Sequence, residues 1–322
     1  MSFPVFSSST TADEVATAFA NEIKGKNVLI TGTSLNGIGF EAARVIAKHA
    51  NLVIITGYDA ARLKLSEETI RKDVPFANIR GLILDLSSLS AVRKAAAEVI
   101  ALDEPLHVLI HNAAASQGPF TLTADNLERQ IATGHVGPFL LTKLLVPTLR
   151  AARTAAYTPR VVFVASIAQA SGTGVDFYTL ARPDAAAYTS FGAYFQTKTA
   201  NVLAASELAK RAKGVLNAYS LHPGLIYTNI YQRPESLADF QAAGLLGLDG
   251  QPNPQMPWRT IPQGAATILA AAFDPRLDKT PGAYLVDCVE ANKELAPHSS
   301  DPNNAEKLWT VTEDIIGEKF VF

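Results

Sequence analysis

Residues 26–44 read KNVLITGTSLNGIGFEAAR, and they define the start of an α/β domain. The apolar run 27–31 predicts a buried strand. A turn with Gly32, Gly37 and Gly39 follows it, and the residues after the turn have the spacing of an amphipathic helix. Glycines let the backbone approach a pyrophosphate, whose charge is received by free N–H groups and by the helix dipole. The stretch therefore predicts a strand–turn–helix unit that binds a dinucleotide.

Apolar strands alternate with helical patterns along most of the chain. The strand candidates are almost continuously apolar, which indicates a parallel sheet covered on both faces. We therefore expect an α/β fold with a doubly wound parallel sheet, in a single domain. The expected strands are 27–31, 52–56, 81–84, 107–111, 160–165, 214–221 and 283–286. The expected helices are 38–49, 60–72, 90–101, 127–152, 191–212 and 262–272.

The N-terminal extension, residues 1–24, precedes the first strand. Thr11 and Glu14 have the spacing of a capping box, which predicts a helix through Ala20 that packs on the outside of the domain. The dinucleotide-binding domain itself is expected over 25–290.

Two further segments fall outside the alternation. Residues 226–260 form a long insertion of glycines, prolines and apolar side chains, which we interpret as a substrate lid, because long loops in compact domains are usually functional. The tail, 291–322, has the pattern of polar turns and one short helix. We expect it to pack on the domain through Trp309 and Phe320.

Composition excludes several classes of protein. With 322 residues, 48% hydrophobic and 18% charged, the chain can bury one large core. A net charge of −2 without a basic stripe argues against nucleic acid as a partner. No apolar run approaches the roughly 20 residues that cross a bilayer, so no membrane span is expected. The one cysteine, Cys288, cannot form an internal disulfide, and we expect a cytoplasmic protein without a metal site.

A tyrosine, a lysine and a serine form the candidate catalytic group. Tyr194 and Lys198 are four residues apart, so a helix over 191–208 would place them on one face. A free tyrosine titrates at about pH 10, and an adjacent ammonium favours the phenolate. Tyr194 could then act as an acid/base near neutral pH. Ser166, at the end of an apolar strand, would hold the substrate oxygen through a hydrogen bond.

The order of these motifs resembles the short-chain dehydrogenase/reductase family over roughly residues 24–290. The motifs are the glycine turn, Asp85, Asn112-Ala113-Ala114, Ser166, Tyr194 with Lys198, and His222-Pro223-Gly224. The stretch AYFQTKTANVL, residues 193–203, is similar to the retinol-dehydrogenase-like and WW-domain-oxidoreductase-like branch, as are 264–266 and 282–285 further on.

The resemblance implies a Rossmann fold and an oxidoreductase that uses NAD(P)(H). Lys198 would bind the nicotinamide ribose hydroxyls as well as tune Tyr194, and Ser166 would orient the substrate. We expect the cofactor-binding residues to be Gly32, Ser34, Asn36, Gly37, Ile38, Gly39, Tyr58, Arg62, Asp85, Leu86, Asn112, Ala113, Tyr194, Lys198, Pro223, Gly224, Ile226 and Thr228.

Two departures from the family pattern concern the backbone. The glycine turn is one residue longer than the usual spacing, which would alter its grip on the pyrophosphate. Gly134 stands where the family has an asparagine that helps hold a water between the catalytic lysine and bulk solvent. A backbone carbonyl at the same place could still hold that water. The neighbouring His135 is rotated about 100° around the helix, so we interpret it as a packing residue.

A third departure concerns the choice between NADP(H) and NAD(H). Relatives that prefer the 2′-phosphate carry an arginine at the position of Tyr58, and relatives that prefer NAD carry an aspartate at about Gly57. Neither is present. Because no carboxylate at Gly57 would repel a phosphate, and because Arg62 is near, we favour NADP(H). NAD(H) is the alternative cofactor, since Asp59 could instead bind a ribose hydroxyl.

These features together predict an NAD(P)(H)-dependent oxidoreductase that interconverts a ketone or aldehyde and its alcohol. The apolar lid suggests a hydrophobic small-molecule substrate. The alternative is a catalytically weak or inactive NAD(P)-binding sensor or interaction protein on the same scaffold. Family members often pair through the two long helices that correspond to 127–152 and 191–212, so a homodimer is possible unless the N-terminal helix or the long insertion covers that face.

Overall fold

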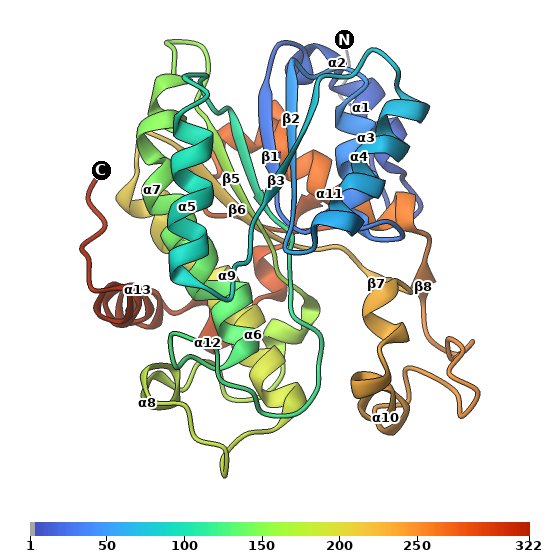
Figure 1. The fold of residues 1–322 in the computed structure, drawn as a ribbon, viewed down its shortest axis with the longest axis vertical. Helices are drawn as coiled ribbons and strands as arrows, with labels where there is room; N and C mark the ends of the chain where they lie inside the picture. Colours follow the sequence, from blue (N-terminus) through green and yellow to red (C-terminus); the bar gives the residue numbers. More distant parts are fainter. Residues whose placement is uncertain (1–3) are drawn as a thin grey trace.

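The computed structural model describes residues 4–322 and contains a mostly parallel eight-stranded sheet (Figure 1). The strand order is β10-β9-β6-β5-β4-β1-β2-β3. The strands are β1 (Asn27–Ile30), β2 (Leu52–Gly57), β3 (Ile79–Ile83), β4 (Val108–His111), β5 (Arg160–Val164), β6 (Asn217–His222), β9 (Tyr284–Val286) and β10 (Val289–Glu290). All of them pair in parallel except β10, an edge strand that was not predicted and runs antiparallel to β9. The predicted doubly wound parallel sheet is confirmed.

The winding direction of the sheet reverses at β1. Val28 of β1 pairs with Val53 of β2 on one side and with Val108 of β4 on the other. In an open α/β sheet, a crevice forms beyond the carboxyl ends of the strands at such a switch point. The residues that follow β1 and β4 therefore lie at the mouth of this crevice.

Helices cover both faces of the sheet, and side chains of β1 alternate between them. Val28 and Ile30 pack in one cluster, whereas Leu29 packs in the other. The first layer contains α1 (Ala12–Ala18), α3 (Ile38–Ile46), α4 (Ala60–Asp73) and α11 (Ile261–Phe273). The second contains α5 (Leu89–Ile100), α7 (Gly137–Ala151), α9 (Ser190–Arg211) and α13 (Pro302–Ile316). Figure 1 shows the sheet between these two layers.

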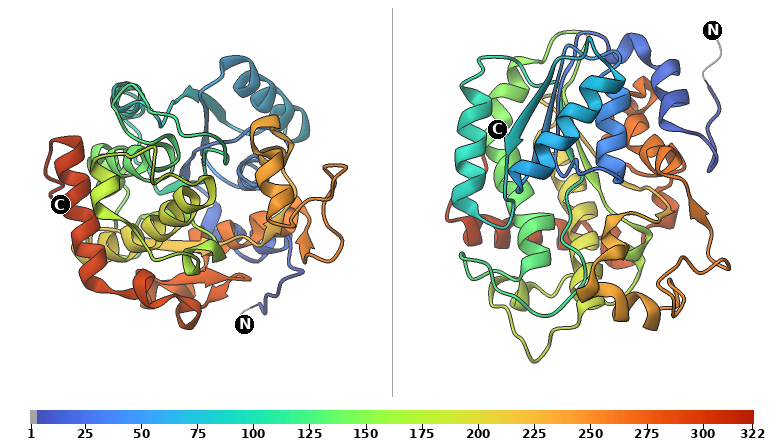
Figure 2. Two further views of the ribbon diagram at one scale, coloured as in Figure 1. Left: turned by 90° about the horizontal axis from the view of Figure 1, so that it is seen from below. Right: turned by 45° about the vertical axis from the view of Figure 1, so that its right-hand side comes forward.

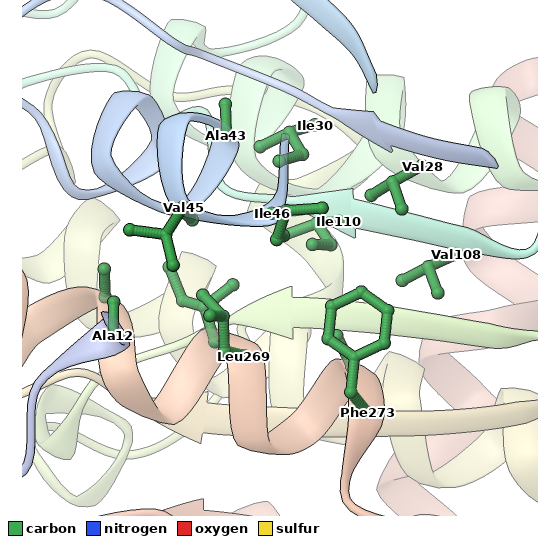
Figure 3. Packing of buried hydrophobic residues seen from close by; sticks show 14 of the residues in the cluster. Ala12, Val28, Ile30, Ala43, Val45, Ile46, Val108, Ile110, Leu269 and Phe273 are labelled. Carbon is green, nitrogen blue, oxygen red and sulfur yellow. The ribbon is translucent and has the colours of Figure 1, made fainter. Parts of the chain in front are cut away.

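The N-terminal extension packs on the first layer. The predicted capping box is confirmed, because the Thr11 hydroxyl accepts from the Glu14 N–H and the Glu14 carboxylate accepts from the Thr11 N–H. The helix ends at Ala18 and is followed by the short α2 (Ala20–Ile23). Figure 3 shows Ala12 beside Val45 of α3 and Leu269 of α11, so the extension adds apolar contacts to the core.

The long helix predicted over 127–152 is interrupted. It consists of α6 (Arg129–Ile131), a π-helical turn η1 (Ala132–Val136) and α7. Periodicity alone did not predict this turn, which packs against α9. His135 is buried within it and hydrogen-bonds Thr312 of α13 at 2.8 Å, so the predicted packing role of His135 is confirmed.

The segment interpreted as a lid has secondary structure of its own. It begins with β7 (Leu225–Ile226) and ends with β8 (Trp258–Arg259), which pair in parallel. Between them lie the 3-10 turn η3 (Asn229–Gln232) and α10 (Pro234–Ala242). Figure 1 shows this segment extending beyond one end of the sheet. The remaining elements are η2 (Ile167–Ala170), α8 (Phe177–Ala181), η4 (Pro275–Lys279), η5 (Asn292–Glu294) and α12 (Pro297–Ser300).

The tail contains a longer helix than expected, α13, and it covers the outer side of α7 and α9. Trp309 is buried, with its ring 4.7 Å from that of Phe139 of α7 and 4.8 Å from that of Phe320. Figure 2 shows α13 along this side of the molecule. The face that we expected to pair two subunits is therefore occupied by the chain's own C-terminal helix.

Candidate active site

The carboxyl ends of the strands open into a cavity of about 460 Å3. The predicted cofactor residues on its wall are Gly32, Ser34, Ile38, Tyr58, Arg62, Asp85, Leu86, Asn112, Ala113, Tyr194, Lys198, Pro223, Gly224, Ile226 and Thr228. The predicted residues that do not line it are Asn36, Gly37, Gly39 and Ser166. The structure thus brings together residues from β1, β2, β4, β5, β6 and α9 around one space.

Two glycines of the turn are required by close packing against the segment after β4. Gly32 has a positive φ of 72°, and a Cβ there would lie 2.7 Å from Ala113 Cα. A Cβ on Gly39 would overlap the side-chain amide of Asn112. Any larger residue would push β1 and β4 apart at the mouth of the crevice.

The extra residue in the turn is absorbed at Asn36, which has a φ of 59°. Asparagine tolerates this left-handed conformation better than most residues do. The helix α3 then begins after Gly37, and no side chain caps its first N–H groups. These donors and the positive end of the helix dipole face the space where an anion would bind.

Thr31 and Asn112 tie the ends of β1 and β4 together. The Thr31 hydroxyl accepts from the N–H groups of Asn112 and Ala113, both at 3.0 Å. The Asn112 amide donates to the carbonyls of Thr31 at 3.0 Å and Gly32 at 2.8 Å. Thr31 was expected only as the last residue of the first strand, whereas β1 ends at Ile30 and Thr31 lies at the crevice.

The candidate catalytic side chains lie together at the end of β5. Helix α9 begins after Thr189, whose hydroxyl accepts from the Gly192 N–H at 3.1 Å. The hydroxyls of Tyr194 and Ser166 are hydrogen-bonded to each other. The Lys198 ammonium lies 5.5 Å from the Tyr194 ring centroid and donates to the Val164 carbonyl at 2.8 Å. Ser166 does not line the cavity itself, and its hydrogen bond with Tyr194 connects it to the site.

Burial governs the protonation of this group. Loss of water around the phenol raises the pKa of Tyr194, and the hydrogen bond with Ser166 acts in the opposite direction. This is opposite to our expectation that Lys198 would lower the pKa of Tyr194. Burial also lowers the pKa of Lys198 to about 8. Tyr194 is consequently a neutral phenol at pH 7, a state in which it can donate a proton.

Gly134, the position without the family asparagine, lies in the π-helical turn beside α9. A Cβ on Gly134 would overlap Cγ2 of Thr197, so the close approach of the two helices requires glycine here. The side-chain amide of Asn201 donates to the Gly134 carbonyl at 2.6 Å. Asn201 is one helical turn beyond Lys198, so the helix that carries the lysine also holds this carbonyl.

The end of the cavity next to β2 carries a free positive charge. Arg62 lines it and makes no ion pair within the described part of the chain. Asp59, the competing carboxylate, caps α4 by accepting from the Arg62 N–H at 3.0 Å. Tyr58 is 60% exposed on the same wall, so its ring is free to contact a ligand.

The large apolar residues of the insertion pack among themselves more than on the cavity. Phe240 is buried against Tyr231, with ring centroids 4.4 Å apart, and Tyr231 also contacts Trp258 at 5.4 Å. The residues of the insertion that line the cavity are Ile226, Thr228, Asn229, Ile230, Tyr231 and Arg233. Composition identified the segment but could not tell which side chains face inward.

Asn229 links the insertion to the glycine turn, because its side-chain amide donates to the Leu35 carbonyl. This hydrogen bond joins the two sides of the crevice. The sequence analysis also missed Arg129 and Thr133, which reach the cavity from α6 and η1. No local motif marks them, and only the interrupted helix places them there.

Comparison with known proteins identifies the family. A profile of the short chain dehydrogenases matches residues 26–182. Short-chain dehydrogenase TIC 32 A, chloroplastic, from Brassica napus is 35% identical, and the match covers 94% of this chain and 92% of that protein. The chain belongs to the short-chain dehydrogenase/reductase family. Members of this family are oxidoreductases that use NAD(P)(H).

The predicted branch of the short-chain dehydrogenase/reductase family is also confirmed. Retinol dehydrogenase 12 from Homo sapiens is 31% identical, over 92% of this chain and 88% of that protein. WW domain-containing oxidoreductase from Danio rerio is 32% identical, over 92% of this chain and 70% of that protein. The crystal structure of a protein from Mycobacterium Paratuberculosis superposes with a TM-score of 0.68 at 27% identity, covering 94% and 98% of the two chains.

Within residues 4–322, no helix has the length and apolarity required to span a bilayer, and no three His, Cys, Asp or Glu side chains are grouped as metal ligands. The expected cytoplasmic location stays a prediction, since the Brassica napus relative is described as chloroplastic.

Proposed function

We propose that this protein is an NADP(H)-dependent oxidoreductase that interconverts an aldehyde or ketone and its alcohol on a small molecule. The observation that carries the proposal is the hydrogen-bonded pair of Tyr194 and Ser166, beside Lys198, at the end of β5. Tyr194 and Lys198 line the cavity that the glycine turn opens, and Ser166 lies behind Tyr194. NAD(H) is the alternative cofactor.

The cavity fits a dinucleotide at both of its ends. The uncapped first turn of α3 offers N–H donors to a pyrophosphate, and the glycines bring backbone close to it. Lys198, Pro223 and Gly224 line the other end, where a nicotinamide ring would lie. A bound dinucleotide would accept or give the hydride.

The protein's own groups would handle the proton. In the reducing direction, Tyr194 gives its proton to the carbonyl oxygen as the carbonyl carbon gains hydride, so the product is a neutral alcohol. Ser166 donates a hydrogen bond to the same oxygen and orients it. The phenolate left on Tyr194 is stabilised by the Lys198 ammonium. The negative charge would draw this ammonium away from the Val164 carbonyl to which it donates.

Tyr194 would regain its proton from solvent by way of Lys198 and a water that the Gly134 carbonyl holds. This carbonyl has a second lone pair, since Asn201 occupies one of the two. A water held there and by Lys198 would connect the lysine with solvent. Asn201 then fixes the carbonyl in place, although the family asparagine is absent.

The preference for NADP(H) rests on charge. A 2′-phosphate beside β2 would meet Arg62, which has no carboxylate partner in the described chain. Asp59 uses one carboxylate oxygen to cap α4 and also lines the cavity, which is why NAD(H) is kept as the alternative. Guanidinium–phosphate contacts are strong and directional, which favours the phosphorylated cofactor.

The test compares the wild type with Tyr194→Phe, using NADPH and NADH in turn against a set of aldehydes and ketones. We expect turnover of the wild type with NADPH and at least about a 1,000-fold loss in the variant, because the proton donor is removed. NADPH affinity, measured by fluorescence titration, should change little. Full activity of Tyr194→Phe would remove the assignment of the acid. Tight NADPH binding without turnover of any carbonyl by the wild type would support a sensor.

A further inference from the structure

Arg129 is a cavity-lining arginine whose donors are mostly unused. It is the first residue of α6, and its Nη2 donates to the Ser116 carbonyl at 3.2 Å. Its Nε is buried and has no hydrogen-bond partner. No ion pair neutralises it within residues 4–322. A guanidinium has five N–H donors, and a buried donor without a partner costs stability, so this arrangement favours an incoming acceptor.

A second arginine, Arg233, reaches the same cavity from the insertion. Its Nη1 lies 3.7 Å from Oε1 of Glu235, which is beyond hydrogen-bond distance. Both side chains are more than a third exposed, at 35% for Arg233 and 41% for Glu235. Such a solvent-exposed pair is weak. Arg233 can therefore turn toward a ligand at little cost.

The two arginines belong to segments that meet at Gly118. A Cβ on Gly118 would lie 3.2 Å from Arg129 Nη2 and 3.5 Å from Cγ of Glu235. The hydroxyl of Ser236, next along α10, donates to the Gln117 carbonyl at 2.7 Å. The insertion is thus fixed to the loop after β4, whose Ser116 carbonyl accepts from Arg129.

The acidic groups near this point do not use the donors of Arg129. Glu128 accepts from the N–H groups of Gln130 and Ile131, both at 2.9 Å, and is committed to capping α6. Glu235 lies beside Arg233, with which it forms a weak ion pair. Arg129 interacts electrostatically with Glu128, but its Nε keeps an unused donor in the cavity that Ile230 and Tyr231 also line.

We propose that Arg129, assisted by Arg233, binds a carboxylate on the carbonyl substrate, whose apolar part contacts Ile230 and Tyr231. The substrate class is then an aldehyde or ketone that carries an acidic group, rather than a purely hydrophobic molecule. This inference rests on the proposed function for the reaction, but the binding of the acid does not depend on turnover.

The first experiment measures kcat/KM with NADPH for 4-formylbenzoate, 6-oxohexanoate and the methyl ester of each. We expect at least one acid to exceed its ester by about 10- to 100-fold, the usual value of a hydrogen bond to a charged group. Arg129→Met should abolish the preference, and Arg129→Lys should retain part of it. Arg153→Met, at an exposed position just beyond the end of α7, is the matched control and should keep the wild-type ratio.

The second experiment separates the possible sources of the anion. Calorimetry with the NADPH complex should show that 4-methylbenzoate binds about tenfold or more tightly than 4-methylbenzamide, and that Arg129→Met removes the difference. NADPH affinity should be the same in wild type and Arg129→Met. A large loss of NADPH affinity would assign the arginine to a cofactor phosphate and overturn the inference.

Equal binding of the acid and the amide by the wild type would also overturn it. A wild type that binds the acid through Arg129 but turns over neither acid nor ester would instead refute the proposed reaction while leaving the anion site in place. The two failures are therefore distinguishable.

Discussion

The side-chain amide of Asn201 donates a 2.6 Å hydrogen bond to the main-chain carbonyl of Gly134. Asn201 and Lys198 are on one turn of α9, so this bond couples the π-helical turn to the helix that carries the candidate catalytic residues. A π-helical turn within a longer helix often occurs at a functional site. The relationship gives Asn201 a positioning role that can be measured.

Asn201→Ala removes the donor and should lower kcat about tenfold with little change in KM, because proton return is slowed while substrate contacts stay intact. Steady-state kinetics would check this, together with the solvent deuterium isotope effect, which should rise as the proton step becomes limiting. Asn201→Asp places a carboxylate against the carbonyl and should be worse. A variant with unchanged kcat and isotope effect would show that Asn201 has a packing role and no role in proton return.

Gly134→Ala should destabilise the protein, because its methyl group would overlap Cγ2 of Thr197. We expect a loss of about 1–3 kcal/mol in the free energy of unfolding, as for other overpacked cores. Thr197→Ser removes Cγ2 and keeps the hydroxyl that donates to the Ala193 carbonyl at 2.8 Å. The double variant should therefore recover stability in urea denaturation, and a failure to recover would place the strain elsewhere.

Acidification should unfold the protein through its buried imidazoles. Burial lowers the pKa of His135 from 6.5 to about 4 and that of His111 to about 3. Between pH 6.5 and 4 the unfolded chain binds protons at these sites and the folded chain does not, so stability falls as the pH is lowered. Each histidine adds up to about 1.4 kcal/mol per pH unit to this slope.

His135→Gln tests the assignment, because glutamine can hydrogen-bond Thr312 but does not titrate. Urea denaturation at a series of pH values should give a shallower decline for this variant. At pH 8, where imidazoles are neutral in both states, the stability difference between variant and wild type should no longer change with pH. An unchanged acid slope would exclude His135 as a contributor.

Trp309→Ala should lower the free energy of unfolding by about 3–5 kcal/mol, since a buried indole is replaced by a cavity. Trp309 is 2% exposed and contacts the rings of Phe139 and Phe320. Leu248→Ala is the control, because Leu248 is 98% exposed and its loss should matter by less than about 0.5 kcal/mol. Similar effects of the two substitutions would mean that α13 contributes little to the core.

Local patterns predicted the parts of the molecule that depend on neighbours in sequence. The strand 27–31, the glycine turn and the helix after it occur in the structure as β1, the turn and α3. Periods of 2 and 3.6 residues and glycine conformations are local properties. For the same reason the four-residue spacing of Tyr194 and Lys198 was enough to place them on one side of α9.

Features set by distant contacts were not predictable in this way. Gly134 of the π-helical turn packs against Thr197, more than sixty residues later in the sequence, and Arg129 lines a cavity formed by distant segments. The sequence positions of the aromatic residues in the insertion did not predict that their rings would pack on one another. The direction of the Tyr194 pKa depended on burial, which a motif does not report.

The cover that α13 forms over α7 and α9 has a consequence for synthesis on the ribosome. Residues 302–316 emerge after the helices that they protect, so the nascent chain presents Phe139 and its neighbours to the surroundings until α13 has been made. Exposed apolar surface of this kind makes incomplete chains prone to association. Residues 302–316 therefore shield an apolar surface that α7 and α9 cannot cover by themselves.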